Sequence, residues 1–288
     1  RLLTEGAQRI AAGDLSGRIE ATGADEIARL GRAFEAMRVK LEASRREIEE
    51  RAMGMEQRNI ELAADLGART FVLWGGREGA EYDHAKDVRA ALDRYAEAMN
   101  TLTSFVIERG YDIRFAIEPK PNEPADVAYV PTIGHALALG SRCADPSRVG
   151  VLIESAHAIL AGLDPADEID FACAFGKLWS LHLNDQNGLK YDQDRPFGCT
   201  NLRSAFDQIR ALERNGYGKK GEYVCFDVHP FRTTKEEHWL DHLTNSRRTF
   251  LRLLDKVRTF DEKAAQGLVA DRNYQALDQM VIEHLMGK

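Results

Sequence analysis

The sequence has no apolar run long enough to cross a membrane and no concentration of positive charge. No stretch approaches the roughly 18 uninterrupted apolar residues of a membrane-spanning helix, and no secretory signal peptide is recognisable. A membrane tether would therefore need a helix before Arg1. The 39 Lys and Arg against 46 Asp and Glu leave a net charge of −7, and neither half is basic. This balance argues against nucleic acid as a main partner.

Cysteine is also scarce. Four cysteines lie far apart and form no Cys-x-x-Cys pair, at positions Cys143, Cys173, Cys199 and Cys225. This pattern argues against a disulfide framework and against a thiolate zinc site, and it indicates reduced thiols in a cytoplasmic protein. With 44% hydrophobic and 30% charged residues, the 288-residue chain is typical of a folded protein. Its length allows one large α/β barrel or two smaller domains.

Residues 1–56 contain no proline, no histidine and a single aromatic residue, Phe34. A short apolar seam ends at Gly13-Asp14, and a second helical pattern begins at Asp25. In that second helix, apolar positions recur at spacings of three and four, which is a heptad seam. Its members are Ile27, Leu30, Phe34, Met37, Leu41, Ser44 and Ile48. The segment is therefore predicted to form a helix, a connector and a second helix whose seam a dimer would bury.

Two strings in this segment carry a family resemblance. "AAGDLSGRI" (residues 11–19) and "GADEIARLGRAFEAM" (residues 23–37) resemble the HAMP domain, a parallel four-helix linker of bacterial receptors, over about residues 1–50. This resemblance implies a dimeric module that transmits a conformational signal. We therefore expect residues 1–56 to be a domain separate from residues 57–288.

Residues 57–288 alternate between strand-like and helical patterns. Continuous apolar strands separated by helices predict a parallel sheet covered by helices, in an α/β fold. Helical patterns lie, for example, at 85–109, 133–141 and 201–215, and the chain is expected to close with a helical tail. Five strands are expected, at residues 70–74, 113–119, 149–155, 177–184 and 223–228. A closed (β/α)₈ barrel has eight strands, so a TIM barrel would be incomplete in this chain.

Side chains of the types that bind metal ions recur at or near the ends of these strands. They are Glu118, Glu154, His157, His182, Asp192, Asp194 and Asp227. Because parallel strands end at the same edge of a sheet, these side chains are expected to converge. Carboxylates with imidazole and without thiolate favour Mg²⁺ or Mn²⁺ and also admit Co²⁺. Seven ligands are too many for one octahedral ion, so two divalent ions sharing a carboxylate are expected.

Local strings from about residue 58 to the C-terminus carry a second, closer resemblance. "VLWGGREGAE", "GYDIRFAIEPKPNEP", "HLNDQNGLKYDQD" and "LDQMVIEHLMGK" resemble D-xylose isomerase in this order. The resemblance implies a metal-dependent isomerase that interconverts D-xylose and D-xylulose, and also D-glucose and D-fructose, by a two-metal 1,2-hydride shift. It also implies an oligomer, a tetramer in that family, while the heptad seam indicates at least a dimer.

The resemblance implies a role for each matching residue. Glu118, Glu154 and Asp227 match ligands of a structural metal, and Glu154 would bridge to a catalytic metal completed by His157, Asp192 and Asp194. Lys120 matches the lysine that hydrogen-bonds the sugar carbonyl oxygen, and Trp74 matches an aromatic wall of the sugar site. Asn184 is expected to contact substrate. We expect Lys120, His157 and Asp194 to act in catalysis.

Two departures from the xylose isomerase pattern stand out. His182 occupies the position of an aspartate ligand, so the site loses one negative charge and shifts toward Mn²⁺ or Co²⁺. His229 replaces a residue that is usually lysine. The family's first three strands, with the His/Asp pair that opens the sugar ring, have no counterpart in residues 1–56. Poor stability in isolation and weak ring opening are therefore expected.

These observations leave three functions open. The first is the aldose–ketose isomerase, which retains nearly all of the ligand positions. The second is a HAMP-type signalling module whose isomerase-like part is catalytically incomplete. The third is a protein that binds sugar without turnover, which the missing ring-opening pair would favour.

Overall fold

The structure, a computed structural model, describes residues 2–75, 82, 84, 86–123 and 127–287. The chain divides into two compact units, residues 1–66 and 67–288. The helix that carries the heptad seam continues without a break past residue 56 and ends at Asp65, so the division falls at the end of this helix. Within the described residues, no helix is both long enough and apolar enough to cross a lipid bilayer.

The first unit consists of helix α1 (Leu2–Ala11), a connector and the long helix α2 (Glu26–Asp65). Asp25 caps α2 by accepting a hydrogen bond from the Ala28 amide. A Cβ on Gly31 would lie 2.5 Å from Ala21 Cβ and 2.7 Å from Leu3 Cδ1, so only glycine allows this close approach. This helix–connector–helix arrangement is the one expected from the sequence.

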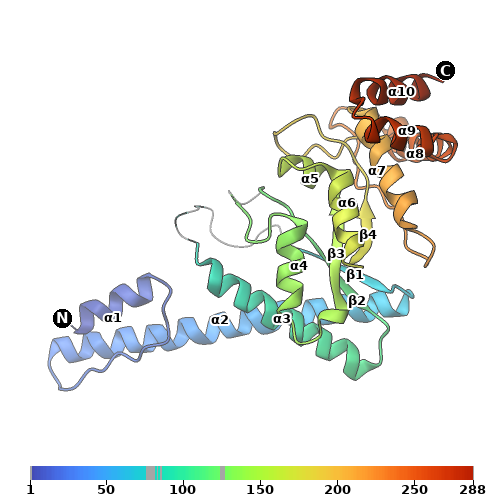
Figure 1. Ribbon diagram of the computed structural model, residues 1–288. Helices are drawn as coiled ribbons and strands as arrows, with labels where there is room; N and C mark the ends of the chain where they lie inside the picture. The colour runs from blue at the N-terminus through green and yellow to red at the C-terminus, as the bar shows by residue number, and fades with distance from the viewer. Residues whose placement is uncertain (1, 76–81, 83, 85, 124–126, 288) are drawn as a thin grey trace. The chain divides into compact units, whose positions relative to one another are not determined.

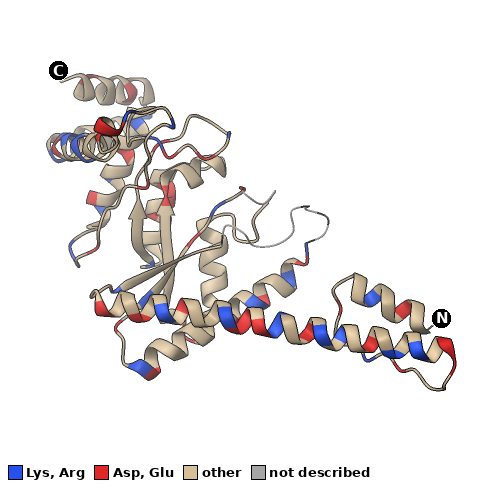
Figure 2. Ribbon diagram, turned by 180° about the vertical axis from the view of Figure 1, so that it is seen from behind, with Lys and Arg blue, Asp and Glu red and all other residues tan. Residues whose placement is uncertain are grey.

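Two side chains of α2 hold the connector. Glu35 accepts a hydrogen bond from the Ile19 amide at 2.7 Å, and Arg38 donates to the Leu15 carbonyl at 2.6 Å. The hydrogen bond from Arg38 to Glu35 lowers the pKa of that carboxyl to about 2. Charged residues of both signs alternate along α2, as Figure 2 shows. The seam side chains Ile27, Met37 and Ile48 are 68%, 41% and 65% exposed, so the seam is open in the single chain.

The second unit contains a parallel sheet in the order β1-β2-β3-β4. The strands are β1 (Thr70–Trp74), β2 (Arg114–Glu118), β3 (Val149–Glu154) and β4 (Leu178–His182). All six residues of β3 are buried, as expected of a central parallel strand covered on both faces. Four of the five expected strands are therefore confirmed, and in the described residues the sheet is an open part of a barrel.

The prediction of a fifth strand at residues 223–228 is wrong. Only Cys225 pairs with the sheet, through an isolated bridge to His182. The Cys225 amide donates to the Leu181 carbonyl at 3.0 Å, and the Cys225 carbonyl accepts from the Leu183 amide at 2.8 Å. The segment lies at the edge of the sheet with no further described strand beyond it, and Tyr223 is 80% exposed. Pairing on one side at a single residue therefore leaves the segment irregular.

Helices connect the strands and cover the sheet (Figure 1). The helices that match the expected patterns are α3 (Val88–Arg109), α4 (Ile133–Ser141) and α7 (Leu202–Asn215). Residue 85, where the first of these patterns was expected to begin, lies outside the described residues. The short helices between β2 and β4 are the 3₁₀ helix η2 (Pro146–Arg148), α5 (Ser155–Leu160) and α6 (Pro165–Ala174). Helices α4 and α6 pack directly on β3.

The chain closes with a group of helices beside α7 (Figure 1). They are the 3₁₀ helix η3 (Glu236–His238), α8 (Asp241–Thr259), α9 (Glu262–Ala270) and α10 (Tyr274–Met286). The ring of Phe206 on α7 contacts Phe260 edge-on, with 5.5 Å between centroids, and Phe260 contacts His284 of α10. These aromatic contacts attach the helical tail to the barrel portion.

Replacing Gly150 by alanine should destabilise the sheet. A Cβ at Gly150 in β3 would lie 2.4 Å from Trp179 Cδ2 and 2.8 Å from the Lys177 carbonyl oxygen. One of these groups must move, which should lower the free energy of unfolding by about 1–3 kcal/mol. Urea unfolding followed by circular dichroism measures this loss. Gly134→Ala is the control, because its nearest contact is 3.8 Å away, and it should change stability by less than about 1 kcal/mol. Equal midpoints for both variants would contradict the packing argument.

Candidate metal and sugar site

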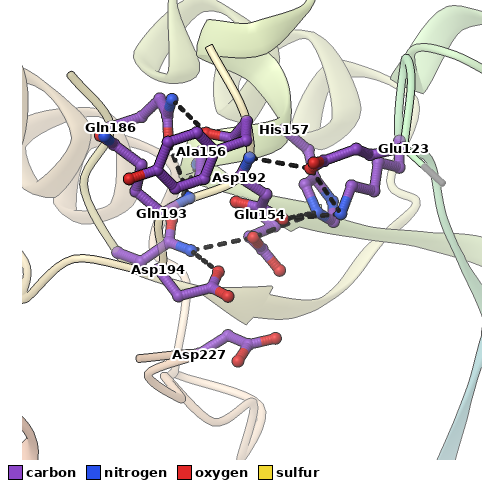
Figure 3. A network of polar contacts seen from close by, with 12 residues as sticks. Glu123, Glu154, Ala156, His157, Gln186, Asp192, Gln193, Asp194 and Asp227 are labelled. Atoms are coloured by element: carbon purple, nitrogen blue, oxygen red, sulfur yellow. Dashed lines mark hydrogen bonds and ion pairs between the residues drawn. The ribbon is translucent and has the colours of Figure 1, made fainter. Parts of the chain in front are cut away.

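The site lies where the parallel strands end. Glu118 is the last residue of β2, Glu154 of β3 and His182 of β4, and the register pairs Glu154 with His182. Asp227 follows Cys225, the residue that bridges to His182. Because the strands are parallel, all of these side chains emerge at the same edge of the sheet. Figure 3 shows Glu154 and Asp227 at this edge, near the loop that carries Asp192 and Asp194.

The structure brings four of the predicted ligands into one group: Glu118, Glu154, His182 and Asp227, with ligand atoms all within 4.8 Å of one another. His182 Nδ1 lies 3.8 Å from Asp227 Oδ2 and 3.9 Å from both Glu118 Oε2 and Glu154 Oε2. These distances are too long for hydrogen bonds. Atoms at such spacings can each lie about 2 Å from a cation between them.

A second group shares Glu154 with the first and adds His157 of α5 and Asp192 of the following loop. His157 Nε2 lies 3.2 Å from Glu154 Oε1 and 3.1 Å from Asp192 Oδ2 (Figure 3). Both His157 and Glu154 are buried, with exposed fractions of 6% and 2%. Glu154 is therefore the one carboxylate that belongs to both groups of the described residues.

Asp194 is close to this second group but does not belong to it. Its Oδ1 accepts a hydrogen bond from Asn184 at 3.1 Å, and its Oδ2 lies 3.3 Å from His229 Nδ1. Its backbone is in the left-handed region, with φ of 44°, which few residues other than glycine adopt. Such strain is common where a side chain must point in a fixed direction.

Lys120 and Trp74 lie beside the second group. Lys120 Nζ donates to Asp192 Oδ2 at 2.8 Å and lies 5.5 Å from the centroid of the Trp74 ring. Trp74 is 49% exposed, whereas the Lys120 side chain is 11% exposed. The exposed ring of Trp74 can pack against the C–H groups of a sugar, and the partly buried ammonium group of Lys120 can donate to sugar oxygens. The Gly-rich string that follows Trp74, residues 76–81, lies outside the described residues.

Asn184, which was expected to contact substrate, is buried among the ligand residues. Its side chain is 1% exposed, and its Nδ2 donates to Glu154 Oε1 at 2.9 Å and to Asp194 Oδ1. Its Oδ1 accepts from the Ala156 amide at 2.7 Å. All the amide hydrogens and the oxygen are thus engaged within the protein. Asn184 holds Glu154 and Asp194 in fixed relative positions.

The site concentrates negative charge. Burial, followed by the charges of Glu118, Asp192 and Asp227, raises the pKa of Glu154 well above its usual range. Burial and the charges of Asp192 and Asp227 raise the pKa of Asp194 to about 6. Burial also raises the pKa of Asp192, but hydrogen bonds from His157 and Lys120 outweigh it and hold that pKa below its usual range. A divalent cation would reduce the repulsion that raises the pKa values of Glu154 and Asp194.

The residues present fit divalent cations. Three buried polar atoms of the two groups have no hydrogen-bond partner, namely His157 Nδ1, His182 Nδ1 and Asp192 Oδ1. A buried polar group without a partner is costly, and a bound ion is one arrangement that would satisfy it. Carboxylates and imidazoles together suit Mn²⁺, Co²⁺ or Zn²⁺ as well as Mg²⁺.

Several residues of the site were not predicted from the sequence. Glu123 has φ of 59° and accepts a hydrogen bond from the Asp192 amide at 2.9 Å, so it anchors the ligand loop. Asp185 and Gln186 are buried at 4% and 3% and bind main-chain groups of the same loop. Both lie in the string HLNDQNGLKYDQD that carries the resemblance, but nothing in that string distinguishes them from ordinary loop residues.

Comparison with known proteins defines the family. A sequence model of the family described as xylose isomerase-like TIM barrel matches residues 12–242. The chain therefore belongs to the xylose isomerase-like TIM-barrel family.

Solved structures share the fold. A D-tagatose 3-epimerase-like protein is 17% identical, with a TM-score of 0.60 over 74% of this chain and 72% of that chain. L-ribulose 3-epimerase is 15% identical, with a TM-score of 0.52 over 88% and 90%. The IOLI protein with a binding zinc atom is 16% identical, with a TM-score of 0.53 over 75% and 72%.

Two expectations from the sequence are not supported by these comparisons. The family match begins at residue 12, inside the segment that was expected to be HAMP-like, and the comparisons do not support the HAMP resemblance. They also do not single out xylose isomerase within the family.

Replacing Asp194 by asparagine should change how stability depends on pH. The pKa of Asp194 is about 6, against an ordinary value of 3.8. A raised pKa in the folded state means that stabilisation by the bound proton is complete below about pH 4 and is lost as the pH rises through about 6. Without metal, the free energy of unfolding of Asp194→Asn relative to wild type should therefore increase by about 2–3 kcal/mol between pH 4 and pH 7. Urea unfolding in a chelator measures this difference.

Asp271→Asn, at an exposed position after α9, serves as the control and should follow wild type at every pH. Asparagine tolerates the left-handed backbone of position 194, so the variant is expected to fold. A difference between Asp194→Asn and wild type that stays constant from pH 4 to pH 7 would contradict the raised pKa.

Proposed function

We propose that the protein is a metal-dependent sugar isomerase of the xylose isomerase type, which interconverts D-xylose and D-xylulose. The observation that carries the proposal is the pair of ligand groups that share Glu154 and lie next to Lys120. Family membership supports the same class of reaction. D-Glucose and D-fructose are further candidate substrates, because they differ from the pentose pair by one hydroxymethyl group.

Two divalent cations are proposed, one held by Glu118, Glu154, His182 and Asp227 and the other by Glu154, His157 and Asp192. Asp194 is proposed as a further ligand or proton acceptor beside the second group. When bound, such cations polarise sugar oxygens and stabilise negative charge that develops on them. His182 in place of a carboxylate lowers the negative charge of the first group, which favours Mn²⁺ or Co²⁺ over Mg²⁺.

The protein's own side chains then orient the sugar. Burial lowers the pKa of Lys120, but the hydrogen bond and the charge of Asp192 more than reverse this, so the lysine stays protonated. A protonated Lys120 can donate a hydrogen bond to the sugar carbonyl oxygen. Trp74 offers an apolar surface within 5.5 Å of the lysine that would keep water from the carbon atoms between which hydrogen moves.

A neighbouring reaction of the same class is the main alternative. A D-tagatose 3-epimerase-like protein and L-ribulose 3-epimerase share the fold. Inversion at C3 of a ketose also requires a polarised carbonyl and carboxylates that accept and return a proton. The exposed ring of Trp74 could pack against either an aldose or a ketose. The first test therefore includes a ketose as well as an aldose.

Sugar turnover tests the proposal directly. The purified chain should convert D-xylose to D-xylulose with Mn²⁺ or Co²⁺ and lose this activity in a chelator. Glu154→Gln should lower kcat/KM by about 100-fold or more, because the residue belongs to both ligand groups. Glu237→Gln, at a side chain that is 68% exposed, is the control and should retain activity.

Each other outcome has a definite meaning. Conversion of D-tagatose at C3 without aldose turnover would replace the isomerase by an epimerase. Metal-dependent sugar binding without any turnover would leave a sugar-binding protein. The absence of both metal and sugar binding would overturn the proposed function.

We further propose that residues 1–56 mediate oligomerisation, with dimers formed through the α2 seam. Exposed apolar side chains at heptad spacing are the observation that favours it. A HAMP-type signalling role for this unit is the alternative function, and it rests on the helix–connector–helix arrangement of α1 and α2. A tetramer, as in xylose isomerases, would need contacts beyond this seam.

Placing a charge in the seam should dissociate the oligomer. Leu41 is a seam residue that is 44% exposed, and Leu41→Glu would put two like charges together in a dimer. We expect the dimer dissociation constant to rise by about 10-fold or more, as measured by light scattering across a concentration series. Val39→Glu, at a 48% exposed position off the seam of the same helix, should leave the dimer intact. A monomeric wild-type protein, or equal effects of both variants, would contradict the seam interface.

A further inference from the structure

The loop that carries Asp192 and Asp194 is closed at its base by main-chain pairing. The Asp185 amide donates to the Arg195 carbonyl at 2.9 Å, and the Arg195 amide donates to the Asp185 carbonyl at 3.2 Å. The Asp185 carboxylate also accepts from the amides of Thr200 and Asn201 at 2.7 and 3.0 Å. The base is thus fixed by contacts that do not involve the interior of the loop.

The side chain of Gln186 is buried inside the loop and makes three hydrogen bonds to its main chain. This side chain is 3% exposed. Its Nε2 donates to the carbonyls of Gly188 and Tyr191 at 2.9 and 3.0 Å, and its Oε1 accepts from the Gln193 amide at 3.1 Å. The main chain is therefore tied to Gln186 on both sides of Asp192, and Figure 3 shows Gln186 and Gln193 beside the ligand residues.

The position of Asp192 depends on these hydrogen bonds and on Glu123, which accepts from its amide, because the surrounding charges attract and repel its carboxylate in different directions. Lys120 and His157 attract its carboxylate at 2.8 and 3.1 Å, whereas the carboxylates of Glu154 and Asp194 repel it when they are ionised. A loop free to move would settle toward Lys120 and away from the carboxylates. Asp194 in addition has a left-handed backbone, which needs support from its neighbours.

We propose that Gln186 is a positioning residue: by tying the main chain around Asp192, it sets the affinity of the Glu154–His157–Asp192 group for a divalent cation. Its own amide is fully engaged with main-chain groups, so it contacts neither the cation nor the sugar. This inference rests on the proposed function, since it concerns the second of the two cations proposed there. It assigns to a residue outside the ligand set the preorganisation of that site.

Two variants of Gln186 and a control variant of the adjacent residue test the proposal. Gln186→Leu removes all three hydrogen bonds at similar size, and Gln186→Glu keeps an acceptor for the Gln193 amide but places an oxygen against two carbonyls. Asn187→Ala is the control, because Asn187 is the adjacent loop residue and is exposed. Thermal unfolding of the metal-free proteins checks that each variant is folded.

The main measurement is a calorimetric titration of the metal-free protein with Mn²⁺. Wild type and Asn187→Ala should bind two ions. In both Gln186 variants the binding event at the Glu154–His157–Asp192 group should lose about 10-fold or more in affinity, while the other event should stay within about twofold. The absorption spectrum of bound Co²⁺ should change only for the ion at the Glu154–His157–Asp192 group. A purely structural role of Gln186 would lower the melting temperature and weaken both events alike.

A second measurement needs no metal. Lys190 is exposed in this loop, so trypsin cleavage after Lys190 reports how often the loop opens. Cleavage of the metal-free Gln186 variants should be about fivefold faster or more than that of wild type, with no change for Asn187→Ala.

Unchanged second-ion affinity in the Gln186 variants, equal weakening of both events, or a wild type that binds only one ion would overturn the positioning role. Failure of the proposed function looks different. A wild type that binds two Mn²⁺ ions but turns over no sugar would remove the isomerase and leave the role of Gln186 in place.

Discussion

Repulsion among closely spaced carboxylates, with Glu118 and Glu154 buried, is the constraint around which the site is organised. The parallel register brings Glu118 and Glu154 to one edge, and the chain adds Asp227 and the ligand loop to the same place. Nothing in strand packing favours such a concentration of charge. Neighbouring groups offset part of the repulsion. Lys120 and His157 form hydrogen bonds with Asp192, and Asn184 donates to Glu154 and Asp194. The repulsion that these contacts do not offset is that among the three carboxylates around His182, and a cation bound between them would offset it.

Much of this arrangement could be predicted from the sequence. Continuous apolar strands between helical patterns predicted β1 to β4, and parallel strands bring their ends together without further information. The convergence of Glu118, Glu154 and His182 follows from that topology alone. The division of the ligands into two groups that share Glu154 came from a family resemblance, and the structure groups these side chains in the same way, apart from Asp194.

Other features could not be predicted, because they depend on contacts between segments far apart in the sequence. The segment around Cys225 has the composition of a strand, yet a strand also needs neighbours, and only one side of this segment is paired. The hydrogen bonds from Asn184 to Glu154 and Asp194 could not be predicted either, because the three residues lie on different segments that only the fold brings together. The role of Gln186 likewise depends on a loop geometry that no local pattern encodes.

The proposed binding of two cations to groups that share Glu154 would have a consequence for how the protein responds to its surroundings. Two cations that use one carboxylate cannot bind independently, and thermodynamic reciprocity requires each to change the affinity of the other by the same factor. A chain with one cation is then a species of its own, with a charge distribution unlike either the empty or the fully loaded form. The concentration of free divalent metal would set the proportions of the three forms, so the protein would respond to metal supply in a graded way.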